Sequence, residues 1–315
     1  MQRDMMKAVT FNQYGDVDVL QIADVPKPQL QPNTVLVRVH ASAVNPKDTF
    51  IRKGRFKRFT GDNFPQLVGF DFAGEVVESS LENFTIGTRV FGMLEGWHGG
   101  TCAEYILVQA NQLAHLPDTV SWVDAASVPL VSLTALQALR DNAKIQSGMR
   151  FCINGASGGV GSMAVQIAKV YGCHITAIAS ESNHDFLSDL GADICLDYRQ
   201  TDIRNSDQHF DIFFDVFGNT HFRDIKPILS RNGTWVSTVI KQHVFASIAL
   251  SKLSSKSAEL VVVKAVPEDL SQIAEWMVDG QLRAVIHQTY TMAEIAEAHQ
   301  QQQSKHTCGK LVITL

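Results

Sequence analysis

The chain has 315 residues, of which 45% are hydrophobic and 19% charged, a composition typical of a soluble globular protein long enough for two domains. Its formal net charge of −5 lacks the basic excess that nucleic acids and anionic membranes require, so neither is an expected partner. Five scattered cysteines without a Cys-x-x-Cys pair, no signal-peptide core at the amino terminus and no bilayer-length apolar run predict reduced thiols and a cytoplasmic location.

The first part of the chain, up to about residue 120, contains short strand-like runs broken by proline and glycine. Residues 34–40 and 74–78 are two examples, each rich in valine. This pattern is typical of antiparallel β-structure. We therefore expect a β-rich domain there.

From about residue 121 to 265, apolar strand-like runs alternate with helical segments. The expected strands are residues 151–153, 174–179, 194–197, 211–216, 234–239 and 260–263. Such alternation predicts an α/β fold, with a parallel sheet covered by helices on both faces. Helices are then expected at 270–278 and 292–300, followed by a strand at 309–315 that could return to the first domain.

The stretch INGASGGVGS, residues 153–162, lies between the first of these strands and a helix predicted at 163–171. Glycines let a ligand approach the main chain, and a helix amino terminus attracts a pyrophosphate. The next strand ends roughly 20 residues later, as a dinucleotide-binding unit requires. The alternative is a turn that serves packing alone. The predicted cofactor contacts are Gly155, Ala156, Ser157, Gly158, Gly159, Val160 and Gly161.

The end of the second strand bears on the choice between NAD and NADP, because an acidic residue there would repel a 2′-phosphate. Ser180 stands at this position, although Glu181 follows it. Further hydroxyl and amide donors are Ser182, Asn183 and Tyr198. These residues favour NADPH, with Arg199 as a possible cation for the phosphate; the alternative for Ser180 is an ordinary turn residue.

Eight segments together resemble one known family. They are ASAVNPKDTFIRKG (41–54), LVGFDFAGEVVE (67–78), GTRVFGM (87–93), GGTCAEYILV (99–108), AASVPLVSLTALQAL (125–139), INGASGGVGSMAVQIAKVYG (153–172), LGADICLDY (190–198) and GKLVITL (309–315). The chain resembles the zinc-independent, quinone oxidoreductase-like branch of the medium-chain dehydrogenase/reductase superfamily. The resemblance implies a GroES-like catalytic domain from residues 1–120 and 266–315, a Rossmann dinucleotide-binding domain at 121–265, and a homodimer.

Zinc ligands are missing from the positions where alcohol dehydrogenases of this superfamily carry them. The resemblance places Asn45 or its neighbour at the first ligand, Gly69-Phe70-Asp71 at a Gly-His-Glu segment, and Leu130-Val131 near the last ligand. None of these replaces thiolate or imidazole coordination. We therefore expect no metal.

The resemblance also implies which residues border the nicotinamide. Asn45 is expected to contact the cofactor or a substrate oxygen, unless it only forms a turn before Pro46. Thr134 is expected at the start of a helix facing the nicotinamide, with helix capping as the alternative. The remaining candidates at the cofactor edge of the sheet are Phe217, Gly218 and Ser237, although Phe217 and Gly218 could merely end a core strand. Lys310 is expected to be an exposed terminal lysine, and the alternative is that the final strand brings it to the cofactor.

Without a metal, the electron sink must lie in the substrate, and a quinone or an α,β-unsaturated carbonyl provides one. Phe56 stands where enoyl-thioester reductases of the superfamily have a tyrosine, which weakens that substrate class. The expected function is NADPH-dependent reduction of a quinone or activated alkene. The alternatives are a zinc-type alcohol dehydrogenase relative and an NADPH-binding protein without turnover.

Overall fold

The computed structural model describes residues 4–315, which divide into two compact units. The first contains residues 4–130 and 264–315, and the second contains residues 131–263. The expected boundary near residue 120 differs because helix α3 (Trp122–Ser127) packs against strands β3 and β5 of the first unit. Among the described residues, no helix has the length and apolar character needed to cross a bilayer.

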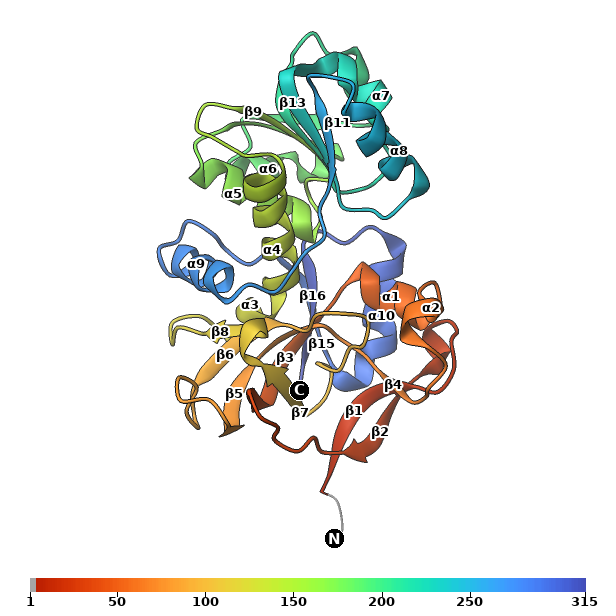
Figure 1. Ribbon diagram of the computed structural model, residues 1–315, viewed down its shortest axis with the longest axis vertical. Helices are drawn as coiled ribbons and strands as arrows, with labels where there is room; N and C mark the ends of the chain where they lie inside the picture. Colours follow the sequence, from red (N-terminus) through yellow and green to blue (C-terminus); the bar gives the residue numbers. More distant parts are fainter. Residues whose placement is uncertain (1–3) are drawn as a thin grey trace. The chain divides into compact units, whose positions relative to one another are not determined.

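The second unit contains a six-stranded sheet in the order β11-β10-β9-β12-β13-β14, and all neighbours are parallel. This order is that of the doubly wound dinucleotide-binding fold, so the predicted Rossmann sheet is confirmed. Figure 1 shows α5 and α6 on one side of the sheet and α7 and α8 on the other. The strands are β9 (Arg150–Asn154), β10 (His174–Ala179), β11 (Ile194–Asp197), β12 (Phe210–Asp215), β13 (Leu229–Ser237) and β14 (Ser257–Leu260).

Helices of the second unit cover both faces of apolar strands. Phe151, Ile153, Phe213 and Phe214 are all fully buried, as expected for strands covered on both sides. The helices are α4 (Pro129–Gln137), which begins in the first unit, α5 (Gly159–Val170), α6 (His184–Asp189), α7 (Phe222–Ile225) and α8 (Gln242–Ser251).

The first unit contains two sheets. The larger has the order β15-β16-β3-β5-β6-β8, with β7 also paired to β3, and the smaller has the order β2-β1-β4. The strands are β1 (Met5–Phe11), β2 (Leu20–Pro26), β3 (Thr34–Val44), β4 (Gln66–Leu67), β5 (Asp71–Ser79), β6 (Arg89–Met93), β7 (Tyr105–Gln109), β8 (Leu113–His115), β15 (Ile286–Thr291) and β16 (Lys310–Thr314). Because β16 pairs antiparallel with β3, the predicted return of the last strand to the first domain is confirmed.

Besides α3, the first unit has helices α1 (Pro46–Arg52), α2 (Lys57–Thr60), α9 (Pro267–Val278) and α10 (Ile295–Ser304). Helix α10 packs against α1 and buries His299 completely. Within residues 4–315, neither ring nitrogen of His299 has a hydrogen-bond partner. Burial, with a smaller contribution from the Arg52 charge, lowers the pKa of His299 to about 3.

Candidate functional site

The predicted cofactor residues lie at the carboxyl ends of five neighbouring strands. Gly155 follows β9, Ser180 follows β10, Tyr198 follows β11, Phe217 follows β12 by two residues, and Ser237 ends β13. The strand register aligns these ends, since Asn154 of β9 pairs with both Ile178 and Asp215, and Asp215 pairs with Ser237. Dinucleotides bind at this edge of a doubly wound sheet.

The glycine-rich turn has the geometry that a pyrophosphate site requires. Gly155 has a φ of +90°, and an added Cβ at Gly161 would lie 2.2 Å from the carbonyl oxygen of Gly155, so helix and turn pack too closely for a side chain. At Gly158, by contrast, an added Cβ would meet nothing nearer than 3.7 Å. The outer side of the turn is therefore open, and a dinucleotide phosphate fits there.

Residues 155–158 form the turn itself, and residues 159–161 form the first helical turn of α5. Of the predicted contacts, Ser157 therefore lies in the turn, and Gly159 and Val160 lie in the first turn of the helix. The N–H groups at the start of a helix have no intrahelical acceptor and favour an anion. The turn is anchored from behind, because the N–H groups of Gly155 and Ala156 both donate to the carbonyl of Ile178 at 3.2 Å.

The loop after β12 is held by Asp215, a fully buried carboxylate. Its Oδ1 accepts the Gly218 N–H at 2.8 Å, and its Oδ2 accepts the N–H and hydroxyl of Thr220 at 2.9 and 2.6 Å. Asn154 Nδ2 also donates to Oδ1 at 2.9 Å, which ties this loop to β9. Phe217 is 53% exposed at the loop, and its backbone nitrogen lies 3.4 Å from the position of a Gly155 Cβ. The structure thus brings Phe217 and Gly218 to the glycine turn.

Beyond β10, polar side chains form one connected group. Asn183 Nδ2 donates to Ser180 Oγ at 2.9 Å, and the hydroxyls of Ser180 and Ser182 are 3.2 Å apart. Arg199, the expected phosphate cation, binds Asp197 through two hydrogen bonds of 3.1 and 3.0 Å. These bonds lower the pKa of Asp197 to about 2. Arg199 is therefore already paired with a carboxylate.

The other three candidates, Tyr198, Ser237 and Thr134, differ in how exposed they are. Tyr198 is 60% exposed, whereas Ser237 is fully buried and its Oγ accepts the Val239 N–H at 3.3 Å. Thr134 is 6% exposed and is the sixth residue of α4, which begins at Pro129. The expectation that Thr134 starts or caps a helix is wrong, because the helical segment extends back to the proline, a favoured first residue.

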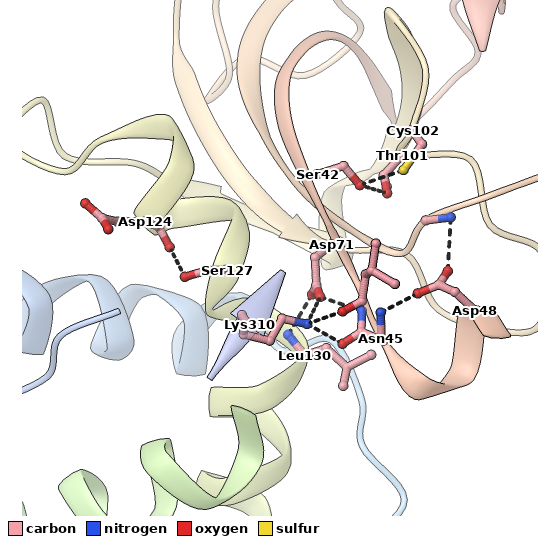
Figure 2. A network of polar contacts seen from close by, with 12 residues as sticks. Ser42, Asn45, Asp48, Asp71, Thr101, Cys102, Asp124, Ser127, Leu130 and Lys310 are labelled. Carbon is pink, nitrogen blue, oxygen red and sulfur yellow. Dashed lines mark hydrogen bonds and ion pairs between the residues drawn. The ribbon is translucent and has the colours of Figure 1, made fainter. Parts of the chain in front are cut away.

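In the first unit, Asn45 belongs to a buried polar cluster with Asp71 and Lys310 (Figure 2). Asn45 Nδ2 donates to Asp71 Oδ2 at 2.8 Å. The Lys310 ammonium donates to Asn45 Oδ1 and to the Val44 carbonyl at 3.1 Å, and lies 3.4 Å from Asp71 Oδ2. Leu130 N–H donates to Asp71 Oδ1 at 2.8 Å. Every oxygen of this cluster faces a donor.

Lys310 is only 4% exposed, so the expectation of an exposed terminal lysine is wrong. Strand β16 places Lys310 in the sheet interior, where burial lowers the pKa of its ammonium and the nearby Asp71 carboxylate opposes that shift. Asp48, in the first turn of α1, accepts the N–H groups of Asn45 and Gly69 at 2.8 and 3.1 Å. Burial nevertheless raises the pKa of Asp48 to about 6.

The three positions at which the resemblance places zinc ligands therefore meet in this chain. Asn45, Asp71 and Leu130 lie together, and an ammonium group from Lys310 lies among them. Within the part of the chain that the structure describes, no three His, Cys, Asp or Glu side chains are grouped as metal ligands. Cys102 is nearby, but burial raises its pKa to about 12, so its thiol stays protonated.

Our interpretation of the sequence missed Asp48, Asp215 and the role of Lys310. A signal was present for Asp215, and for Asp71 as the partner of Lys310, because each of these carboxylates lies at the end of an apolar strand. A carboxylate in such a run needs a buried partner, either a cation or several N–H donors. The sequence does not say which partner, since Asp71 and Lys310 are 239 residues apart.

Comparison with known proteins agrees with this geometry. A family model described as "Alcohol dehydrogenase GroES-like domain" matches residues 31–118, and one described as "Zinc-binding dehydrogenase" matches residues 190–313. The chain is 30% identical to the chloroplast envelope quinone oxidoreductase homolog of Arabidopsis thaliana, with 99% of both chains covered. It is also 30% identical to the human mitochondrial NAD(P)H oxidoreductase RTN4IP1, with 99% of this chain and 89% of the relative covered.

Among solved structures, the quinone oxidoreductase from Coxiella burnetii is similar, with a TM-score of 0.92, 31% identity, and 99% and 100% of the two chains covered. These matches support an oxidoreductase that works with a nicotinamide cofactor. The chain belongs to the medium-chain dehydrogenase/reductase superfamily, in its quinone oxidoreductase-like branch.

Proposed function

We propose that this protein reduces a quinone or an α,β-unsaturated carbonyl with NADPH and without a metal ion. The observation that carries the proposal is the open glycine turn between β9 and α5, at the carboxyl edge of a sheet in dinucleotide-binding order. The relatives whose printed names include quinone oxidoreductase support the substrate class.

Residues of the second unit would hold the cofactor. The turn at 155–158 and the first turn of α5 receive the pyrophosphate, and the loop fixed by Asp215 borders the same turn. Ser180 and Asn183 would bind the 2′-phosphate of NADPH, because both offer uncharged donors. Tyr198 is exposed and can add its hydroxyl.

When bound, NADPH supplies a hydride to the acceptor carbon, and the electrons displaced onto the acceptor oxygen are neutralised by a proton from solvent. Asn45 would donate a hydrogen bond to that oxygen as its negative charge develops. Thr134 is proposed as a second polar contact. The Lys310 ammonium lies among the positions where the resemblance expects zinc ligands, and there it binds Asn45 and Asp71.

A binding experiment with two glycine variants tests the cofactor site. Gly158→Ala should fold normally, because the backbone φ of −75° suits alanine and the methyl group meets no protein atom within 3.4 Å. The methyl group would occupy the space proposed for the pyrophosphate, so the dissociation constant for NADPH should rise about tenfold or more. Gly100→Ala is the matched control, since its methyl group would make only ordinary contact with Leu67 at 3.6 Å.

The activity is tested by NADPH oxidation with 1,4-benzoquinone, 9,10-phenanthrenequinone and an enone, each repeated with NADH. We expect turnover with the quinones. In the binding experiment, we expect the dissociation constant for NADPH to be unchanged in Gly100→Ala. Binding without turnover on any acceptor would identify a non-catalytic binding protein instead. One tightly bound zinc per purified chain would identify a zinc-type alcohol dehydrogenase relative.

A homodimer and a cytoplasmic location are also part of the proposal. Strand β14 is an edge of the second unit's sheet, and exposed apolar side chains occur near it: Leu250, Leu253 and Val262 are 63%, 89% and 66% exposed. An open sheet edge with apolar neighbours suits pairing with a second copy. Light scattering on the purified protein would reveal a monomer if this part is wrong.

A further inference from the structure

The orientation of the Asn45 side-chain amide is determined by two opposite charges. Its oxygen faces the Lys310 ammonium, and its nitrogen donates to the Asp71 carboxylate at 2.8 Å. A flipped amide would place its NH₂ group against the ammonium and its oxygen against the carboxylate. Both contacts would be repulsive, so the charges permit one orientation.

Strand pairing delivers the lysine to this position. Leu311 of β16 pairs with Val44 of β3, so Lys310 lies next to Asn45 at the end of the strand pair. The ammonium has three oxygen neighbours, on Val44, Asn45 and Asp71. A buried cation is tolerated only where its hydrogens are satisfied in this way.

The amide nitrogen of Asn45 carries two hydrogens, and Asp71 accepts one of them. The second hydrogen has no acceptor among residues 4–315, although Asn45 is only 1% exposed. The backbone N–H of Asn45 is separately bound by Asp48 at 2.8 Å, which fixes the main chain at this point. Both the backbone and the amide of Asn45 are therefore held, and one donor remains.

We propose that Lys310 is a positioning residue, which together with Asp71 locks the Asn45 amide so that its second hydrogen is presented as a donor to the acceptor oxygen. The role in reduction rests on the proposed function, whereas the locking of the amide does not. Lys310 acts through Asn45 and needs no contact with the substrate. The ammonium also offsets the charge of Asp71 in a buried setting.

The locking is tested by NMR on protein labelled with ¹⁵N-asparagine, in which Asn45→Leu identifies the Asn45 resonances. In the native protein the two Nδ2 protons should be widely separated in chemical shift, because one is bonded to a carboxylate and the other is not. In the double variant Lys310→Met/Asp71→Asn this separation should fall by half or more, since neither charge then orients the amide. In Lys305→Met, an exposed lysine on the turn before β16, it should stay unchanged.

Lys310→Met leaves Asp71 buried without its cation, so the variant can be unstable. The neutral double variant Lys310→Met/Asp71→Asn keeps an oxygen for the Leu130 N–H and removes both charges. It should therefore fold, whereas in Lys310→Met alone the Asp71 carboxylate still accepts one Asn45 proton. Native-like separation in the folded double variant overturns the proposal.

Kinetics give the second readout. In the double variant kcat should fall about 100-fold, as for the loss of one oxyanion donor, while the NADPH dissociation constant stays within about twofold of the native value. Recovery of kcat to within about threefold in the double variant would show a purely structural ion pair and overturn the donor role. If the native protein reduces no acceptor, the proposed function fails, and the NMR result still decides whether Lys310 positions Asn45.

Discussion

The buried His299 makes the stability of the first unit depend on pH in a way that one substitution can isolate. The side chain is fully buried, and burial together with the Arg52 charge lowers its pKa from 6.5 to about 3. The folded state therefore contains neutral histidine, whereas the unfolded chain binds a proton below about pH 6.5. This contribution to stability is present above pH 6.5 and is lost progressively as the pH falls toward 3.

The size of the effect follows from linkage. At pH 5 His299 is protonated in the unfolded chain and neutral in the folded chain. Because pH 5 lies 1.5 units below the unfolded pKa of 6.5, this difference lowers the free energy of unfolding by about 2 kcal/mol. His299→Leu removes the proton-binding group without breaking a hydrogen bond, because neither ring nitrogen has a partner among residues 4–315. Between pH 7.5 and 5, the free energy of unfolding of the variant should therefore fall by about 2 kcal/mol less than that of the native protein.

Urea unfolding at pH 7.5, 6.5, 5.5 and 5.0 measures this difference. The native curve alone is not diagnostic, because Asp48 has its pKa raised to about 6 and its contribution changes in the opposite direction, being lost as the pH rises. Subtracting the variant's free energy of unfolding from that of the native protein at each pH cancels the contribution of Asp48, which both proteins share. His306→Leu, an exposed histidine, is the control and should follow the native curve. If His299→Leu shows the native pH dependence, the assignment of a buried neutral histidine is refuted.

Four further predictions concern the cofactor unit and the metal. Ser180→Asp should reduce the preference for NADPH over NADH about tenfold, because a carboxylate repels the 2′-phosphate; unchanged kcat/KM ratios for the two coenzymes would contradict the assignment. Gly161→Ala should destabilise the fold by about 3 kcal/mol, through contact with the Gly155 carbonyl at 2.2 Å, and a denaturation midpoint equal to that of Gly158→Ala would be evidence against it. Asp215→Asn should weaken NADPH binding about tenfold, because an NH₂ group replaces one carboxylate oxygen and the loop loses the acceptor for the N–H of either Gly218 or Thr220, as fluorescence titration would measure. Dialysis against EDTA should leave quinone reduction unchanged, and a loss of activity restored by zinc would overturn the metal-free mechanism.

The nucleotide-binding unit was largely predictable because its signals are local. Strands buried on both faces are continuous apolar runs, and the glycine turn and its helix are contiguous in sequence, so the cofactor edge followed from the chain order. Strand β14 was predicted at residues 260–263 but begins three residues earlier, at Ser257. The polar residues Ser257 and Glu259 interrupt the apolar pattern at its start. Strand β15 was missed because four of its six residues are exposed and it resembles a polar loop.

The buried polar cluster of Asn45, Asp71 and Lys310 was not predictable to the same degree, because its contacts join distant segments. Asn45 was singled out by resemblance, but nothing near it in sequence indicates that Lys310 binds its amide oxygen 265 residues away. The lysine was interpreted as exposed since it lies close to the carboxyl terminus, where solvation is common. Sheet pairing between β16 and β3 overrides that expectation.

The position of β16 in the chain has a consequence for biosynthesis. This strand lies between β15 and β3 inside the larger sheet, yet it is the last of the described strands to leave the ribosome. The nucleotide-binding unit, residues 131–263, can complete its sheet while translation continues, but in the first unit residues 41–44 of β3 have to wait for their partner strand. Nascent chains of this protein would therefore complete the sheet that carries the glycine turn before they acquire the lysine that joins Asn45 and Asp71 in the buried cluster.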